Sequence, residues 1–141
     1  MQPLFDHEKL DVYQEAIAFC GWVGEFLETV SGKTAAKDQL DRASTSIPLN
    51  IAEGNGKFSS PDRCRFLGHA YGSALECAAC LDVLVARGLV PGEDVQPGKE
   101  RLRGIVSMLV GLMNSLSNRV AEDREEYVYS AAHEGEVEGK G

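Results

Sequence analysis

The spacing of apolar residues constrains the fold of this chain more than any other feature of its sequence. Apolar side chains recur every three or four residues, the period of an α-helix, in four segments near 8–30, 34–54, 62–88 and 97–122. No segment of useful length alternates with the period of two that a strand requires. We therefore predict an all-α fold for residues 1–121.

Turn signals separate the four segments. Glycine and proline interrupt the apolar pattern at Ser31-Gly32, at Gly54-Asn55-Gly56, and from Gly88 to Pro97-Gly98. Connections this short favour neighbouring helices that run in opposite directions. The expected architecture is an antiparallel up-down-up-down four-helix bundle that oligomerises.

The helix near 8–30 carries two apolar seams where one would suffice. The first contains Leu10, Tyr13, Ile17, Cys20, Gly24 and Leu27, and the second contains Val12, Ala16, Phe19, Val23, Phe26 and Val30. Together they span about 200° of the helix surface, against a little more than about 100° for an ordinary amphipathic helix. One seam faces the core, and we assign the other to an interface with further copies of the chain. The interface prediction is Val12, Phe19, Val23 and Phe26. The alternative is a helix buried on two sides within one subunit.

Charge is distributed unevenly along the chain. The formal net charge is -8, and residues 122–141 hold seven acids against Arg124 and Lys140. We expect this segment to be a disordered acidic tail. The remaining residues carry only -3, without the basic field that is typical of a nucleic-acid-binding domain.

The sequence also bears on location. No apolar run approaches the roughly 18 residues of a membrane span, and the first residues lack the pattern of a signal peptide. We expect a cytoplasmic protein whose four cysteines stay reduced.

Polar residues form a stripe beside the apolar face of the second and third helices. Its members are Arg42, Ser46, Asn50 and Glu53 in the second helix, and Arg65, His69, Ser73 and Glu76 in the third. In an antiparallel hairpin, facing residues have numbers with a nearly constant sum, and here Arg42 with Glu76 and Glu53 with Arg65 both give 118. We predict these two ion pairs, with Gly72 and Ser73 allowing close approach between them.

Two interpretations of this stripe are open. Polar groups at a helix seam fix register and orientation in some bundles. Alternatively, carboxylates and a histidine form an acid–base site, which needs an unpaired acid in a cleft. An arginine beside each acid favours the ionised carboxylate, so we prefer the structural interpretation and expect no catalytic residues.

Backbone signals surround this stripe. Pro48 lies inside the second helix, so we predict a kink there and a carbonyl of Ser44 that needs another donor, such as a hydroxyl or water. Gly54 has the position of a helix C-cap, Ser60 that of the cap of the third helix, and Pro61 that of its first residue.

Metal, redox and phosphate chemistry have weaker signals. Cys77-Ala-Ala-Cys80 has zinc-like spacing, but it lies on a predicted helix without a second ligand pair, so we expect no metal and no cofactor. Basic residues gather in two small groups at opposite ends of the bundle. We assign possible phosphate contacts to Lys57, Arg63, Lys99, Arg101 and Arg103.

The central residues resemble a known family. The run from Arg42 to Lys57, followed by Arg65-Phe66-Leu67 and by Ala70 to Glu76, is similar to the "four helix bundle protein" family, first noticed in intervening sequences of bacterial large-subunit ribosomal RNA genes. The resemblance spans about residues 4–120. It implies a barrel-shaped homopentamer. It also implies a relationship to the accessory variability protein of diversity-generating retroelements, which binds nucleic acid and a reverse transcriptase.

These observations lead to two functional hypotheses. The first is a non-enzymatic homo-oligomeric scaffold or adaptor, whose partners are copies of itself and possible protein partners. The alternative is an accessory protein that binds RNA or DNA and acts with a reverse transcriptase or another nucleic-acid enzyme. The acidic balance favours the first hypothesis.

Overall fold

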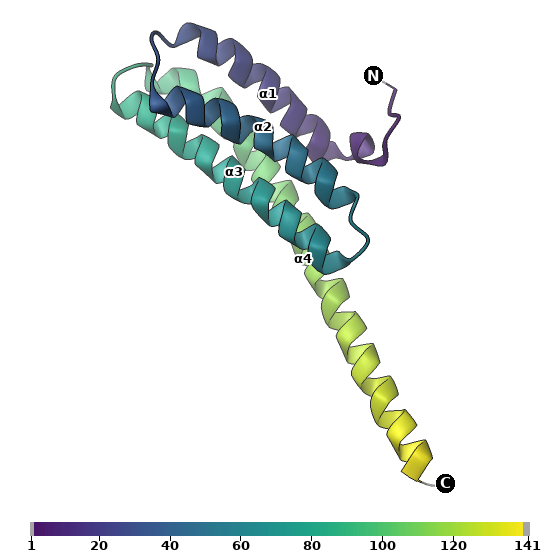
Figure 1. Ribbon diagram of the computed structural model, residues 1–141. Helices are drawn as coiled ribbons and strands as arrows, with labels where there is room; N and C mark the ends of the chain where they lie inside the picture. Colours follow the sequence, from purple (N-terminus) through teal and green to yellow (C-terminus); the bar gives the residue numbers. More distant parts are fainter. Residues whose placement is uncertain (1, 140–141) are drawn as a thin grey trace.

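The chain folds into four packed helices. A computed structural model describes residues 2–139, and no strand occurs among them. A short 3-10 turn, η1 (Asp6–Lys9), precedes the helices, which are α1 (Asp11–Thr29), α2 (Ala35–Asn55), α3 (Ser60–Ala86) and α4 (Gly92–Gly139). Within the described chain α1 contacts α2 and α4, and α3 contacts α2 and α4 (Figure 1). The predicted all-α fold is confirmed.

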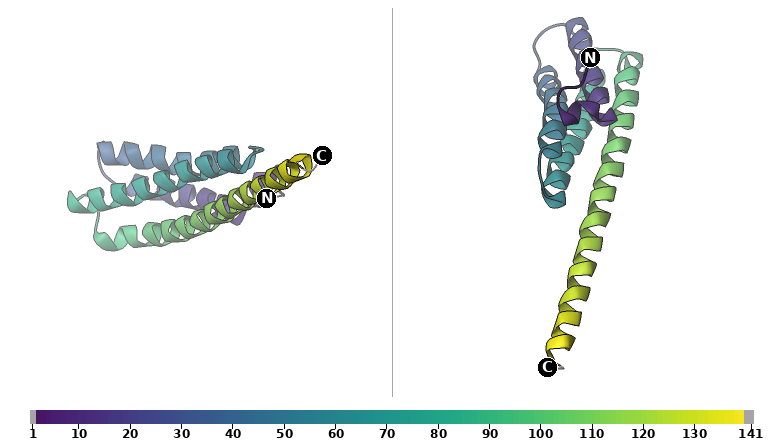
Figure 2. Two further views of the ribbon diagram at one scale, coloured as in Figure 1. Left: turned by 90° about the horizontal axis from the view of Figure 1, so that it is seen from below. Right: turned by 90° about the vertical axis from the view of Figure 1, so that its right-hand side faces the viewer.

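The two ends of the bundle differ. The loops that join α1 to α2 and α3 to α4 lie at one end, and the loop that joins α2 to α3 lies at the other (Figure 1). The helix α4 leaves the bundle at this second end and extends well beyond it (Figure 2). In the part of the chain that the structure describes, no helix has the length and apolar content needed to cross a membrane.

Local sequence explains where α3 begins and ends. Its N-cap is Ser59, whose hydroxyl accepts a hydrogen bond from the backbone N–H of Asp62 at 3.2 Å, so the cap lies one residue before the predicted Ser60. At the other end Gly88 adopts a φ of 71°. The N–H of Leu89 then bonds to the carbonyl of Leu84 at 3.0 Å, which completes a Schellman cap. The prediction that Gly54 caps α2 is wrong, because α2 continues to Asn55.

The fourth helix differs most from the sequence expectation. It begins at Gly92 rather than near 97: Glu93 and Asp94 suit the first turn of a helix, and Pro97 lies inside the helix. It also runs past residue 122 to Gly139, so helix replaces the expected disordered tail over 122–139. Alanine, glutamate and arginine in this segment favour helix. Residues 140–141 lie outside the described part.

The core contains the aromatic seam of α1. Val12, Phe19, Val23 and Phe26 are all buried inside the subunit, so the assignment of these residues to an oligomer interface is wrong. The other seam faces outward in part, with Ile17 exposed and Tyr13 and Leu27 half-buried. Both seams satisfied the helical period, and the bulkier one gains more by burial in the core.

A single tryptophan joins α1 to α4. The ring of Trp22 stacks on Phe26 with centroids 4.8 Å apart, and on Phe19 at 5.9 Å. It lies against Gly98 of α4, where an added Cβ would come within 2.4 Å of the ring. Gly98 therefore provides the space that this aromatic stack occupies.

The helices α2 and α3 approach each other closely at Gly54. A Cβ at this position would lie 2.9 Å from the Cβ of Phe66 and 3.4 Å from the carbonyl oxygen of Arg63. The predicted role of Gly72 is wrong, since nothing lies within 4 Å of a Cβ placed there. The two helices thus pack tightly next to their loop.

A thiol from α1 satisfies the backbone group that Pro48 leaves without its usual partner. Pro48 is buried inside α2 and has no N–H to donate to the carbonyl of Ser44. The thiol of Cys20 donates to that oxygen instead, with sulfur and oxygen 3.2 Å apart. Burial and, secondly, the nearby Asp41 carboxylate raise the pKa of Cys20, which keeps the donating proton on sulfur at neutral pH. The sequence predicted a hydroxyl or water here; the kink itself stays a prediction.

We predict that Gly54→Ala destabilises the protein by about 1–3 kcal/mol, because the new methyl group must push apart α2 and the backbone of α3. The matched control is Gly72→Ala, which enters open space in a helix interior and should raise stability by about 0.5–1 kcal/mol. Urea unfolding measures both changes. Equal effects of the two substitutions would contradict the assigned close approach.

A double-mutant cycle tests the bond between Cys20 and Ser44. Cys20→Ala should cost about 1 kcal/mol in the native chain, because the Ser44 carbonyl loses a donor. In a Pro48→Ala background, where residue 48 regains its N–H, the same substitution should cost clearly less. Cys64→Ala, on the far side of the bundle between α3 and α4, is the control and should cost the same in both backgrounds. An unchanged cost for Cys20→Ala would show that its thiol is not a substitute donor.

Candidate functional site

The polar stripe between α2 and α3 is centred on two serines. The hydroxyl of Ser73 donates to that of Ser46 at 2.9 Å, and the side-chain amide of Asn50 donates to Ser46 Oγ and to the Ser46 carbonyl, both at 2.9 Å. The numbers of Ser46 and Ser73 add to 119, so their contact agrees with the predicted register. Polar groups therefore do meet across this seam.

The charged members of the stripe do not pair as expected. Neither Arg42–Glu76 nor Glu53–Arg65 is an ion pair within 4.0 Å among the described side chains, so both predictions are wrong. Glu76 accepts a hydrogen bond from Gln39 at 3.4 Å, and Arg65 lies 3.7 Å from Asp62. All four charged side chains of the stripe are exposed, and an exposed ion pair contributes only about 0–1 kcal/mol, too little to impose a cross-helix geometry.

The arrangement offers little acid–base chemistry. A serine nucleophile needs a neighbouring base, whereas the partners of Ser46 are an amide and a second hydroxyl. His69 is exposed, and its ring stacks on Phe66 with centroids 5.9 Å apart. The geometry fits the interpretation that these polar residues hold two helices in register.

The two cysteines with zinc-like spacing lie in the core. Cys77 and Cys80 are both buried in α3, and neither is in a disulfide. Burial, followed by Cys80, Glu76 and Cys20, raises the pKa of Cys77 to about 12. Such a thiol stays protonated at neutral pH and packs as a small apolar group. Over the described residues no three potential metal ligands cluster together.

The basic residues of the two bundle ends differ in their surroundings. At the end where α4 begins, Lys99 pairs with Asp82 at 2.7 Å and Arg101 lies 3.9 Å from Glu15, while Arg103 is exposed. Acidic partners make Lys99 and Arg101 poor phosphate contacts. At the opposite end, Arg63 Nε donates to the carbonyl of Lys57 at 2.7 Å, which holds the α2–α3 loop.

Aromatic residues join the basic ones at the α2–α3 loop. The ammonium of Lys57 and the guanidinium of Arg65 each lie 4.9 Å from the centroid of the Phe66 ring. Phe58 at the loop tip is fully exposed. The sequence analysis assigned Arg65 to the polar stripe and gave no role to either phenylalanine. The available signal was the alternation of basic and aromatic residues across a loop rich in glycine and serine.

Comparison with known proteins supports the fold and identifies the family. No curated protein sequence is significantly similar to the chain. A solved structure from Bacteroides thetaiotaomicron, described as a protein with unknown function from the S23 ribosomal protein family, superimposes with a TM-score of 0.68 at 20% identity. The match covers 72% of this chain and 97% of that one, so it concerns the same helical fold. The sequence model described as 23S rRNA-intervening sequence protein matches residues 8–111, which is most of the bundle. The chain belongs to the 23S rRNA-intervening sequence protein family.

Proposed function

We propose that this protein is a non-enzymatic scaffold or adaptor that acts as a closed ring of identical subunits in the cytoplasm. The observation that carries this proposal is the exposure of large apolar side chains on all four helices. We define the first patch as the exposed apolar side chains of α1 and α2, and the second patch as those of α3 and α4. In the proposed subunit the helices alternate in direction, up-down-up-down. The short loops at alternate ends and the contact of Ser46 with Ser73 support this order.

The first patch lies on α1 and α2. Ile17 is 40% exposed and Leu49 is 63% exposed. Gly21 and Gly24 are exposed in the middle of α1, with nothing within 4 Å of an added Cβ. Each glycine lowers stability by about 1 kcal/mol relative to alanine in a helix interior. Contacts with a neighbouring subunit that approaches the backbone there would offset this loss.

The second patch lies on α3 and α4. Leu75 is 48% exposed and Val110 is 38% exposed. Because α1 contacts α2 and α4, and α3 contacts α2 and α4, the α1–α2 side and the α3–α4 side are opposite sides of the bundle. The two patches therefore lie on different pairs of helices.

Two different patches favour a ring over a two-fold dimer. A dimer with two-fold symmetry pairs one patch with itself, whereas contact between different patches runs head to tail and closes into a ring. The resemblance to the "four helix bundle protein" family gives five as the expected number of subunits. Four free cysteines, two of them buried, suit the reducing cytoplasm.

Complementation between two variants tests this assembly. Leu49→Glu and Leu75→Glu should each abolish the ring, because each places an unpaired charge in one half of every interface. Mixed together, they should form one-to-one dimers, since each retains the patch that the other has lost. Light scattering coupled to size-exclusion chromatography measures the mass. Phe58→Glu is the control and should leave the ring intact. A native chain that is monomeric, or variants that do not complement each other, would contradict the proposal.

Nucleic-acid binding is the second candidate, favoured by the cluster at the α2–α3 loop. Lys57 and Arg65 supply positive charge around Phe66, and Phe58 offers a free aromatic face. Single-stranded nucleic acids bind to such combinations of cationic and stacking groups. A ring of subunits would present several copies of the cluster on one face. In this role the protein would act with a reverse transcriptase or another nucleic-acid enzyme.

Fluorescence anisotropy with a labelled single-stranded RNA tests this candidate at about 50 and 200 mM salt. The double variant Lys57→Gln/Arg65→Gln should weaken binding and flatten its salt dependence, and Phe58→Ala should cost about 1–3 kcal/mol through lost stacking. The matched control is Lys99→Gln/Arg101→Gln, whose charges already face acids. Absence of binding at the lower salt concentration would eliminate this candidate and leave the scaffold.

A further inference from the structure

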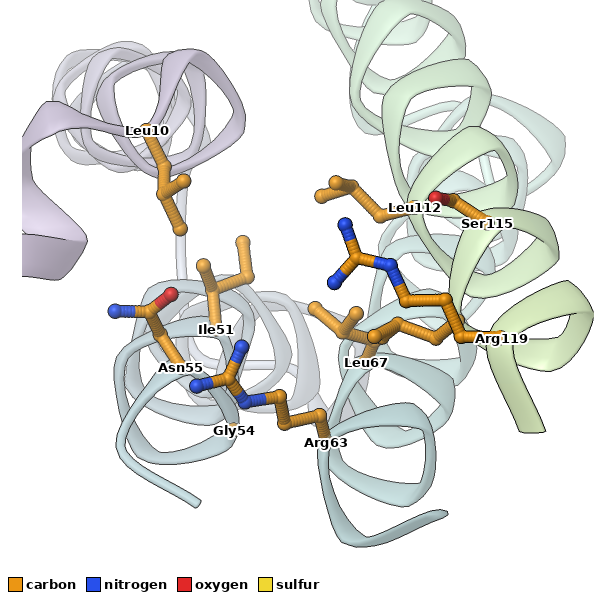
Figure 3. A pocket seen from close by; sticks show the side chains of 10 residues that line it. Leu10, Ile51, Gly54, Asn55, Arg63, Leu67, Leu112, Ser115 and Arg119 are labelled. Atoms are coloured by element: carbon orange, nitrogen blue, oxygen red, sulfur yellow. The ribbon is translucent and has the colours of Figure 1, made fainter. Parts of the chain in front are cut away.

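A pocket lies at the end of the bundle where α4 leaves it, and its floor is apolar. The apolar lining comes from α2, α3, α4 and the residue before α1, and consists of Leu10, Ile51, Leu67, Leu112 and Leu116 (Figure 3). The volume is about 190 Å³. An apolar cavity of about 150 Å³ holds a benzene molecule, so this space suits one ring or a short alkyl chain. It is smaller than the roughly 300 Å³ at which pockets for larger ligands begin, which excludes a whole nucleotide.

Two arginines from different helices line this pocket. Arg119 extends from α4 across the opening, and Arg63 extends from α3 toward Gly54 and Asn55 (Figure 3). The Nε of Arg63 is bound to the Lys57 carbonyl at 2.7 Å, which fixes the side chain and leaves its four terminal N–H groups available. No aspartate or glutamate is among the ten lining residues, and neither arginine forms an ion pair with a side chain that the structure describes.

The apolar floor and the two arginines together indicate the chemistry of a ligand that would fit this pocket. Two guanidinium groups facing one small space repel each other, and a shared anion would remove the repulsion. Planar guanidinium groups match a carboxylate through paired hydrogen bonds, and Ser115 adds a neutral polar group to the lining. Asn55 also lines the pocket, but its side-chain amide donates to the Asp6 carboxylate at 3.0 Å. An inorganic anion would gain nothing from the leucine and isoleucine floor, whereas an apolar body attached to the carboxylate would bury surface there.

We propose that this pocket binds a small organic acid, a carboxylate carried by a single ring or a short alkyl chain. The carboxylate lies between Arg63 and Arg119, and the apolar part rests on Ile51, Leu67 and Leu112. The site is separate from the two patches assigned to assembly and from the exposed Phe58 of the loop. Its test therefore does not depend on either proposed function.

Binding of 4-fluorobenzoate to the full chain, followed by ¹⁹F NMR, tests the proposal. The neutral analogue 4-fluorobenzyl alcohol has the same ring without the charge, and it should bind at least about tenfold more weakly. Arg63→Met and Arg119→Met keep much of the side-chain length while removing the charge, and each should weaken 4-fluorobenzoate binding by a similar factor. Arg103→Met is the matched control, an exposed arginine of the same helix as Arg119 outside the pocket, and should have no effect.

Four results would overturn the proposal. Equal binding of the alcohol and the acid would mean that the pocket only accepts apolar rings. Equal weakening by Arg103→Met would mean a diffuse attraction to charge. Inorganic phosphate that competes as well as 4-fluorobenzoate would mean a phosphate site. Displacement of 4-fluorobenzoate by a synthetic peptide of residues 122–141 would mean that the acidic end of a chain is the natural occupant. The comparison of 4-fluorobenzoate with 4-fluorobenzyl alcohol uses only the native protein. It therefore tests the proposal even if a variant folds poorly.

Discussion

The close packing of α2 against α3 is the contact on which the other features depend. Small residues make it possible: Gly54 leaves no room for a methyl group beside Phe66, and Ala43 of α2 and Ala70 and Ala74 of α3 are buried in the core. The same packing places Ser46 opposite Ser73. It also brings Arg63 to the mouth of the end pocket. Shape complementarity, rather than charge, thus sets the geometry of the candidate sites.

The sequence predicted the helices, the register of α2 against α3 and the position of Pro48 well. The apolar period located all four helices, and the register inferred for α2 and α3 agrees with the contact of Ser46 with Ser73. Pro48 lies inside α2 as expected, and the Ser44 carbonyl has another donor as predicted, although this donor is the Cys20 thiol rather than a hydroxyl or water. These features follow from steric and hydrogen-bonding rules that act over a few residues.

The predictions were wrong where alternative arrangements of the side chains differ little in energy. Two seams of α1 had the same helical period, and only the packing of Phe19 and Trp22 against the rest of the bundle decided which one is buried. Exposed arginines and glutamates have many partners of similar energy, so spacing alone did not place Arg42 or Arg65. The end pocket was not predicted, because its lining comes from residues as distant in sequence as Leu10 and Arg119.

The projecting part of α4 makes the distribution of negative charge uneven along the long axis of the molecule. Residues 122–139 form about 27 Å of helix at 1.5 Å per residue, and this segment holds the seven acids counted in the sequence. The screening length in physiological salt is only about 8 Å, so the outer turns lie too far from Lys57 and Arg63 to neutralise them. In a ring whose subunits point the same way, the acidic projecting helices would surround one rim. A particle of this kind would repel polyanions at a distance while keeping a cationic surface at its base, and it would admit small anions more readily than long ones.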